Sequence, residues 1–274
     1  MSRITVFECP GTSVAASMAG HTIYVPPEEI AKNSFYKGLD PDVFQYVFVQ
    51  GYSNVIKPMG PSVAQGVQIL TDYINNPSVT PGKFALIGTS QGALITSQIV
   101  KKLVAGTIPR AADCLGAFHF GNPAREAGRA FPGAASVPGG RGIANSSYRL
   151  SSTPSWVWEF ANPGDPVCTN DWTSFVGGMR ETTFTNMLTS FDGTLDSLSD
   201  VGQLAQDLVD MMSFGLTSAL DMALYHNGYD SPTYKPGAGD PRTAVQIVID
   251  YLNKIAGPSY RPDGWSTTLR PPTS

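Results

Sequence analysis

The chain has 274 residues, which is within the range of one α/β domain and long enough to bury a sizeable apolar core. Only 15% of the residues are charged, and the formal net charge is −4. This composition excludes the basic surface that nucleic acids and other polyanions require, so we expect no nucleic-acid partner.

The first predicted strand covers residues 3–7 and breaks at the sequence CPGTS of residues 9–13. No apolar segment of about seven to fifteen residues, as in a secretory signal, precedes it. No stretch approaches the roughly 18 consecutive apolar residues of a membrane span. We therefore expect a soluble protein, made in the cytoplasm without a signal peptide and without an integral membrane segment.

Two further elements follow in chain order. Residues 43–49 predict the second strand, and residues 61–74 predict a helix because apolar side chains recur there at helical spacing. The apolar residues that carry this spacing are Val63, Val67, Leu70 and Ile74.

The next strand, residues 83–87, runs into the sequence GTSQG of residues 88–92 and then into a second helical pattern. A G-x-S-x-G motif presents a nucleophile in this context of strand, sharp turn and helix. The glycines allow the turn that lifts the Ser90 hydroxyl above the end of the sheet, and the first helical turn directs N–H groups at the same point. We predict that Ser90 is a catalytic nucleophile. The alternative is an ordinary Gly/Ser turn.

An acid is expected between the nucleophile and a histidine, because α/β-hydrolases have the chain order Ser, Asp or Glu, His. Residues 115–120 alternate like a strand, a loop rich in Gly and Pro covers 121–142, and an aromatic strand at 155–161 leads to Asp165. A carboxylate there would accept an imidazole N–H and hold its tautomer. Asp171 is the nearby competitor, and an aspartate in a Pro-Gly turn is otherwise a turn former.

About sixty residues separate Asp165 from the last histidine, far more than a simple connection needs. Helical patterns near residues 180–191 and over 198–220 fill this interval. Five of the eight methionines lie here: Met179, Met187, Met211, Met212 and Met222. We expect residues 169–225 to form a helical lid or linker within a single domain of residues 1–274, with a thioether surface for long acyl chains. The alternative is that these helices bury the methionines against the sheet.

The chain contains three histidines. His21 follows the first strand and His119 lies within a strand, so both are expected to be packed or surface residues. His226 occurs in the sequence YHNGY, a turn-rich stretch before the final helix. It is the histidine late enough in the chain to act as the base.

Acyl transfer also needs two hydrogen-bond donors for the developing oxyanion. The backbone N–H of Gln91, directly after the nucleophile, is the first candidate, and the loop after the first strand should supply the second. We select Thr12, through its amide and its hydroxyl, because Gly11 permits close approach of the backbone. Strands separated by helices predict a doubly wound parallel sheet with helices on both faces.

Five features of the sequence together resemble the lysin B esterases of mycobacteriophages, which are cutinase-like α/β-hydrolases. These features are GTSQG at 88–92, FGNPAR at 120–125, NPGDPVC at 162–168, the helical insertion and HNGY at 226–229. The resemblance covers about residues 3–256. It implies a three-layer α/β-hydrolase sandwich with a central, mostly parallel sheet and a helical insertion between the catalytic Asp and His.

The resemblance implies a serine esterase that hydrolyses the ester between mycolic acids and arabinogalactan in the mycobacterial envelope, and so aids phage lysis of the host. The implied catalytic residues are Ser90, Asp165 and His226, with Gln91 as an oxyanion donor. No metal or organic cofactor is implied. The expected partner is mycolyl-arabinogalactan or another long-chain acyl ester, and the chain is expected to act as a monomer on the envelope after release.

Three alternatives stay open. The same residues would serve a cutinase or lipase on soluble lipids, a mycolyl-type acyltransferase, or a non-catalytic envelope-binding protein that keeps the fold. Some lysin B proteins carry an amino-terminal peptidoglycan-binding module. Because the first predicted strand starts near Arg3, we expect no such module here. Fungal cutinases are secreted and disulfide-bonded, whereas the widely spaced Cys9, Cys114 and Cys168 predict free thiols, at most one disulfide and no zinc site.

Overall fold

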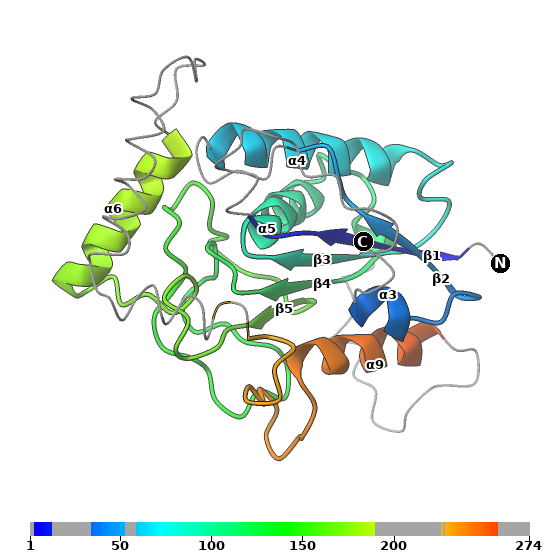
Figure 1. The fold of residues 1–274 in the computed structure, drawn as a ribbon. Helices are drawn as coiled ribbons and strands as arrows, with labels where there is room; N and C mark the ends of the chain where they lie inside the picture. The colour runs from blue at the N-terminus through cyan, green and yellow to red at the C-terminus, as the bar shows by residue number, and fades with distance from the viewer. Residues whose placement is uncertain (1–2, 13–33, 53–58, 190–225, 227, 257–274) are drawn as a thin grey trace, which may run out of the picture.

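The computed structural model describes residues 3–12, 34–52, 59–189, 226 and 228–256. Its centre is a five-stranded sheet in the order β2-β1-β3-β4-β5, and every neighbouring pair of strands is parallel (Figure 1). The strands are β1 (Ile4–Cys9), β2 (Phe44–Phe48), β3 (Phe84–Thr89), β4 (Cys114–Phe120) and β5 (Val157–Phe160).

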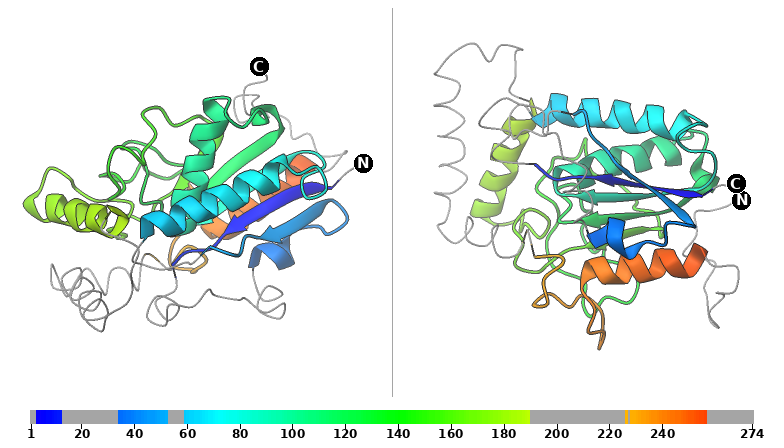
Figure 2. Two further views of the ribbon diagram at one scale, coloured as in Figure 1. Left: turned by 90° about the horizontal axis from the view of Figure 1, so that it is seen from above. Right: turned by 45° about the vertical axis from the view of Figure 1, so that its right-hand side comes forward.

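Helices cover both faces of the sheet and produce three layers (Figures 1 and 2). One face carries α4 and α5, and the other carries α3 and α9, while α6 lies at one end of α4. The helices are α3 (Ser34–Gly38), α4 (Met59–Asn75), α5 (Gln91–Val104), α6 (Phe175–Thr189) and α9 (Ala244–Ala256), with a short 3-10 turn at Ala111–Asp113. The α/β-hydrolase sandwich predicted from the sequence is confirmed.

Burial on both faces explains the continuous apolar strands. Residues 84–87 of β3 have no solvent exposure, as is typical of the centre of a parallel sheet covered by helices. One apolar cluster, which includes Leu86 and Leu94, fills the space between the sheet and α4 and α5. A second, which includes Phe118 and Val248, lies between the sheet and α3 and α9. Each fully buried side chain of this kind stabilises the fold by about 1.5–3 kcal/mol.

The strand order also determines where a ligand can approach. From β1 the chain goes to one neighbour, β2, and then returns to add β3, β4 and β5 on the other side. In open α/β sheets ligands bind beyond the carboxyl ends of the strands, at the point where the strand order reverses. Here that point lies between β1 and β3, next to the loop at residues 10–12 and the GTSQG turn.

The largest boundary difference concerns α6, which begins at Phe175 rather than near residue 180. The hydroxyl of Ser174 accepts the N–H of Gly177 at 3.0 Å, which caps the helix and starts it earlier than the apolar pattern indicates. The five-residue helix α3 is absent from the prediction because so short an element carries no periodicity. The predicted helix at 198–220 lies outside the described residues.

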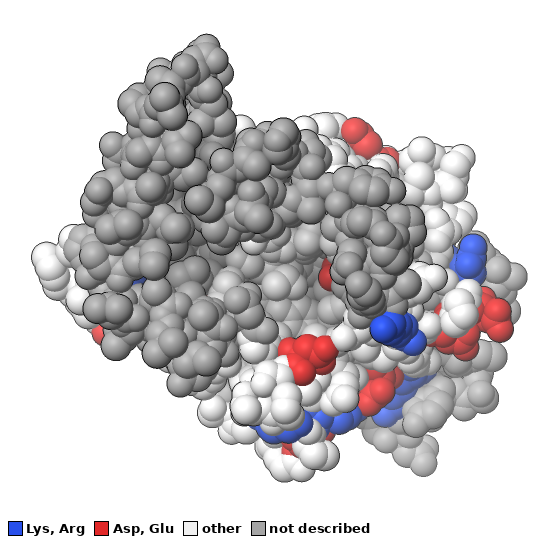
Figure 3. Space-filling model, viewed as in Figure 1, with Lys and Arg blue, Asp and Glu red and all other residues white. Residues whose placement is uncertain are grey.

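The surface carries charges of both signs, and the cysteines form no disulfide in the part of the chain that the structure describes. On the face shown in Figure 3, acidic and basic side chains are interspersed toward the lower right. Arg242 forms ion pairs with both Asp240 and Asp250. The three cysteines are buried, free thiols. None of the helices in the described part of the chain is long and apolar enough to cross a membrane.

Candidate active site

Ser90 occupies a strained turn between β3 and α5. Its φ of 54° makes it the one residue other than glycine with a positive φ in the described part of the chain. A side chain in this region costs of order 1–3 kcal/mol and persists only where the surrounding packing requires it. The turn is the sharp strand-to-helix elbow that a G-x-S-x-G nucleophile occupies, and Ser90 remains partly exposed there.

The two glycines of the motif permit this elbow by close packing. A Cβ on Gly88 would lie 2.6 Å from the Cα of Ala93, and one on Gly92 would lie 1.9 Å from the carbonyl oxygen of Cys9. Helix α5 therefore starts directly against the ends of β1 and β3, and its amino terminus is next to Ser90. The partial positive charge of a helix amino terminus favours negative charge at this point.

Asp165 and His226 form a buried pair. The Nδ1 atom of His226 lies 2.9 Å from Oδ2 of Asp165, and the carboxylate has no solvent exposure. Burial by itself raises the pKa of Asp165, but the adjacent imidazole and the hydrogen bonds that the carboxylate accepts outweigh it, and the pKa lies below its usual value. Because an ionised carboxylate only accepts hydrogen bonds, Nδ1 carries the hydrogen and Nε2 of the neutral ring has a free lone pair.

The end of β4 connects this pair to the Ser90 turn. The N–H of Ser90 donates to the carbonyl of Phe120 at 2.9 Å. The next residue, Gly121, has a φ of +60°, and a Cβ there would lie 2.8 Å from the His226 ring and 2.9 Å from Oδ2 of Asp165. Two consecutive residues thus contact the serine turn on one side and the acid–histidine pair on the other.

The loop after β1 also approaches Ser90. A Cβ on Gly11 would lie 3.2 Å from the Cβ of Ser90. The Thr12 hydroxyl donates to the side-chain oxygen of Gln91 at 3.1 Å, and the buried Gln91 amide donates in turn to Ser62 at 3.0 Å. The Thr12 hydroxyl is therefore committed to Gln91, so its backbone N–H is the group left to act as a donor to an oxyanion.

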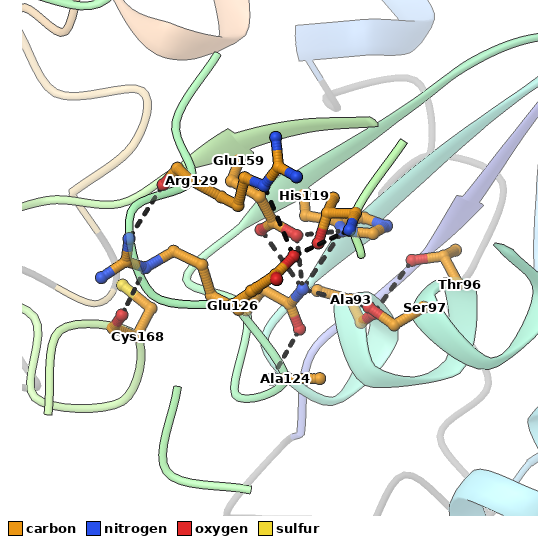
Figure 4. Close-up of polar contacts among 12 residues, drawn as sticks. Ala93, Thr96, Ser97, His119, Ala124, Glu126, Arg129, Glu159 and Cys168 are labelled. Atoms are coloured by element: carbon orange, nitrogen blue, oxygen red, sulfur yellow. Dashed lines mark hydrogen bonds and ion pairs between the residues drawn. The ribbon is translucent and has the colours of Figure 1, made fainter. Parts of the chain in front are cut away.

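His119 has a different environment. Its ring is fully buried, and Nδ1 lies 3.0 Å from the Glu159 carboxylate on β5. The Asn122 amide donates to Glu159 at 2.9 Å and to Ser97 on α5 at 3.0 Å (Figure 4). His119 is thus a packed strand residue, as expected from the sequence. His21 lies outside the described residues.

Asp171, the competing acid, takes part in a surface turn. Its carboxylate accepts both the hydroxyl and the N–H of Thr173, at 2.6 Å and 3.1 Å, and these bonds hold its pKa below the usual value. The side chain is exposed, and it accepts these hydrogen bonds from within its own turn. The structure therefore brings Asp165, and not Asp171, to His226.

Tyr229 and Arg125 make contacts near the site that the sequence does not predict. Tyr229 donates its hydroxyl to Asp165 at 2.6 Å. The buried guanidinium of Arg125 donates to the carbonyl oxygens of Cys168 at 2.6 Å and Arg129 at 2.8 Å (Figure 4), and also to Gly139 and Gly140. Arg125 thereby attaches the loop that carries the acid to the segment that follows β4.

The parallel sheet, the strained serine turn and the acid–histidine pair define an α/β-hydrolase fold. Among solved structures the chain is similar to lysin B from mycobacteriophage D29, with 21% identity and a TM-score of 0.58 over 92% of this chain and 99% of that one. The resemblance inferred from the motifs is confirmed at the level of the fold.

Other comparisons are weaker. A cutinase-like protein from Cryptococcus sp. aligns with 68% of this chain and 95% of its own, at 18% identity and a TM-score of 0.39. The PE-PPE domain family model matches residues 40–148. No curated protein matches the sequence.

Proposed function

We propose that the protein is a serine esterase that works by acylation and deacylation. One observation carries this proposal: Phe120 and Gly121, consecutive at the end of β4, contact both the strained Ser90 turn and the Asp165–His226 pair. A nucleophile, a base and an orienting acid gathered at the carboxyl edge of a sheet are the requirements of acyl transfer. The α/β-hydrolase fold supports the same conclusion.

In the first step, Nε2 of His226 accepts the proton of Ser90 while Oγ attacks the ester carbonyl. The backbone N–H groups of Thr12 and Gln91 stabilise the oxyanion, and the alcohol leaves with the proton returned by His226. Water then attacks the acyl-enzyme. His226 accepts a proton from this water and returns it to Ser90, which releases the carboxylic acid. Asp165 holds the imidazole in the required tautomer throughout.

The proposed substrate is the ester between mycolic acids and arabinogalactan in the mycobacterial envelope, cleaved as phage lysis proceeds. The sequence motifs and the shared fold with a mycobacteriophage lysin B support this choice. The region 169–225 is proposed to receive the long acyl chain. Its described part includes α6, and residues 190–225 lie outside the described residues.

Two experiments test the esterase activity and the proposed substrate separately. Hydrolysis of p-nitrophenyl butyrate and labelling by a fluorophosphonate test the esterase, and both should be lost in Ser90→Ala. The matched control is Ser78→Ala, an exposed serine in the turn before β3 at the opposite end of the sheet, which should keep both activities. Retained hydrolysis in folded Ser90→Ala would refute the nucleophile.

Lipid analysis of purified mycobacterial envelope tests the substrate. Release of free mycolic acid by the wild type and not by Ser90→Ala supports the proposal. Hydrolysis of p-nitrophenyl esters without release of mycolic acid would indicate an esterase that acts on soluble lipids. Transfer of the acyl group to added trehalose, in place of free acid, would indicate an acyltransferase.

A further inference from the structure

Three side-chain donors converge on one oxygen of Asp165. Besides Nδ1 of His226 at 2.9 Å, Oδ2 lies 2.6 Å from the Tyr229 hydroxyl and 3.2 Å from the Cys168 thiol. The other carboxylate oxygen accepts the N–H of Val167 at 2.9 Å. The bond from Tyr229 is the shortest of these contacts, and its length is typical of a strong hydrogen bond to a charged acceptor.

The direction of the bond from Tyr229 follows from the charges. The pKa of Asp165 lies below its usual value, so the carboxylate is ionised and can only accept. Burial raises the pKa of Tyr229 well above its ordinary value, and the ionised Asp165 carboxylate acts in the same direction, so the phenol keeps its proton. The phenol oxygen also accepts the N–H of Asn162 at 3.2 Å. A continuous chain therefore runs from Asn162 through Tyr229 to Asp165.

The Tyr229 ring is fixed independently of its hydroxyl. It packs edge-on against Phe120, with ring centroids 5.9 Å apart, and against Tyr234 at 5.5 Å. Phe120 is the residue whose carbonyl accepts the Ser90 N–H. The hydroxyl is thus held at the acid by a ring that packs against the serine side of the site, and removal of the oxygen alone keeps the ring contacts.

We propose that Tyr229 is a positioning residue for ester hydrolysis, whose hydroxyl holds the Asp165 carboxylate against the His226 imidazole. This inference rests on the function proposed above. The phenol takes up part of the charge of the carboxylate and restricts its rotation, so that Oδ2 stays directed at Nδ1. Without it, Oδ2 would keep the imidazole and a weak thiol donor.

Removal of the hydroxyl should change the pH profile as well as the rate. A carboxylate that has lost a strong donor attracts the protonated imidazole more strongly, so the protonated ring persists to higher pH. The other titratable groups that the structure describes around the pair are Cys168 and Tyr234, whose pKa values are raised by burial, and Arg125, which bonds the Cys168 carbonyl. The two raised groups stay neutral between pH 5 and 8 and cannot produce this shift.

The experiment compares Tyr229→Phe with Tyr234→Phe, which removes a hydroxyl from the neighbouring ring and leaves the contacts to Asp165 intact. We expect kcat on p-nitrophenyl butyrate to fall about tenfold in Tyr229→Phe with KM nearly unchanged, and the acid limb to move up by about half a pH unit. NMR titration of the three histidines measures the same upward shift, at His226, without any assay of activity.

The outcomes separate the two proposals. An inactive wild type would refute the esterase, while the NMR titration would still test Tyr229. Wild-type kcat and an unshifted titration in Tyr229→Phe would overturn the positioning role. If Tyr229→Phe does not fold, site-specific 3-fluorotyrosine at position 229 keeps the ring and supplies a stronger donor. The acid limb should then move to lower pH, and an unchanged or raised limb would overturn the proposal.

Discussion

Replacement of Gly121 by alanine is expected to abolish most of the proposed esterase activity, although Gly121 has no side chain that could take part in the reaction. The added Cβ would lie 2.8 Å from the His226 ring, whereas ordinary van der Waals contact begins at 3.4 Å, so about 0.6 Å must be absorbed. The carboxylate of Asp165 blocks the same direction at 2.9 Å. The imidazole must therefore move relative to Ser90, and a displacement approaching 1 Å in an active site can cost about 100-fold in rate.

The backbone contributes a second, separable cost. Gly121 has a φ of +60°, and an alanine in this region costs roughly 1–2 kcal/mol of stability. Gly128 has a φ of +76° and nothing within 4 Å of its would-be Cβ, so Gly128→Ala carries the backbone cost without the collision. The difference between the two variants isolates the effect of the added methyl group on the Asp165–His226 pair.

The assay is kcat/KM on p-nitrophenyl butyrate, together with urea unfolding of both variants. Gly128→Ala should lose about 1–2 kcal/mol of stability and keep its activity. Gly121→Ala should lose about 100-fold in kcat/KM, with a further loss of about 1–3 kcal/mol from overpacking. Equal kcat/KM in the two folded variants would show that the acid–histidine pair tolerates displacement, and the reasoning would fail.

Other predictions concern the acid, pH and the acyl chain. Asp165→Asn should reduce kcat by about 10⁴-fold because the imidazole tautomer is lost, while Asp171→Asn should retain activity; the reverse result would exchange the two assignments. The general base has to be neutral, and an unperturbed histidine titrates at about pH 6.5, so kcat/KM should rise between pH 5 and 8. A flat pH profile of the acylation step would argue against His226 as the base. Because the pKa of Asp165 is lowered in the folded state, its ionised form stabilises the fold above about pH 4, and this contribution is lost as the pH falls through the lowered pKa. The stability of the wild type relative to Asp165→Asn should therefore decline on acidification. Urea unfolding at a series of pH values measures this difference. Paired Met211→Asp and Met212→Asp changes should impair palmitate esters more than butyrate esters, because each buried CH₂ contributes about 0.8 kcal/mol; equal losses with unfolding would mean that these methionines are core.

The residues that sequence could identify are those with local signals. Ser90 lies in a motif whose glycines are required within a few residues of it, and the flanking strand and helix have clear periodicity. Asp165 and His226 follow from chain order and from their turn-rich surroundings, and the structure joins them at 2.9 Å. Parallel strands also follow from the alternation of elements, since each crossover needs its own helix.

The remaining contacts depend on segments that meet only in the folded chain. Tyr229 and Asp165 are 64 residues apart, and no local pattern identifies a phenol that will bond a distant carboxylate. The same is true of Gly121, whose small size matters because of a ring more than a hundred residues later. The start of α6 escaped prediction for a different reason, because a single capping serine outweighs the apolar spacing.

The burial of Arg125 determines which segments of the chain are expected to unfold locally together. Its guanidinium has no solvent exposure and donates to backbone carbonyls of Cys168, Arg129, Gly139 and Gly140. Exposure of any one of these carbonyls to water would leave a buried cation short of an acceptor, so these stretches of backbone are expected to open together. Local unfolding in proteins proceeds by such cooperative units. The acid loop and residues 129–140 should therefore share one rate of amide hydrogen exchange, and a protease that cuts one should gain access to the other.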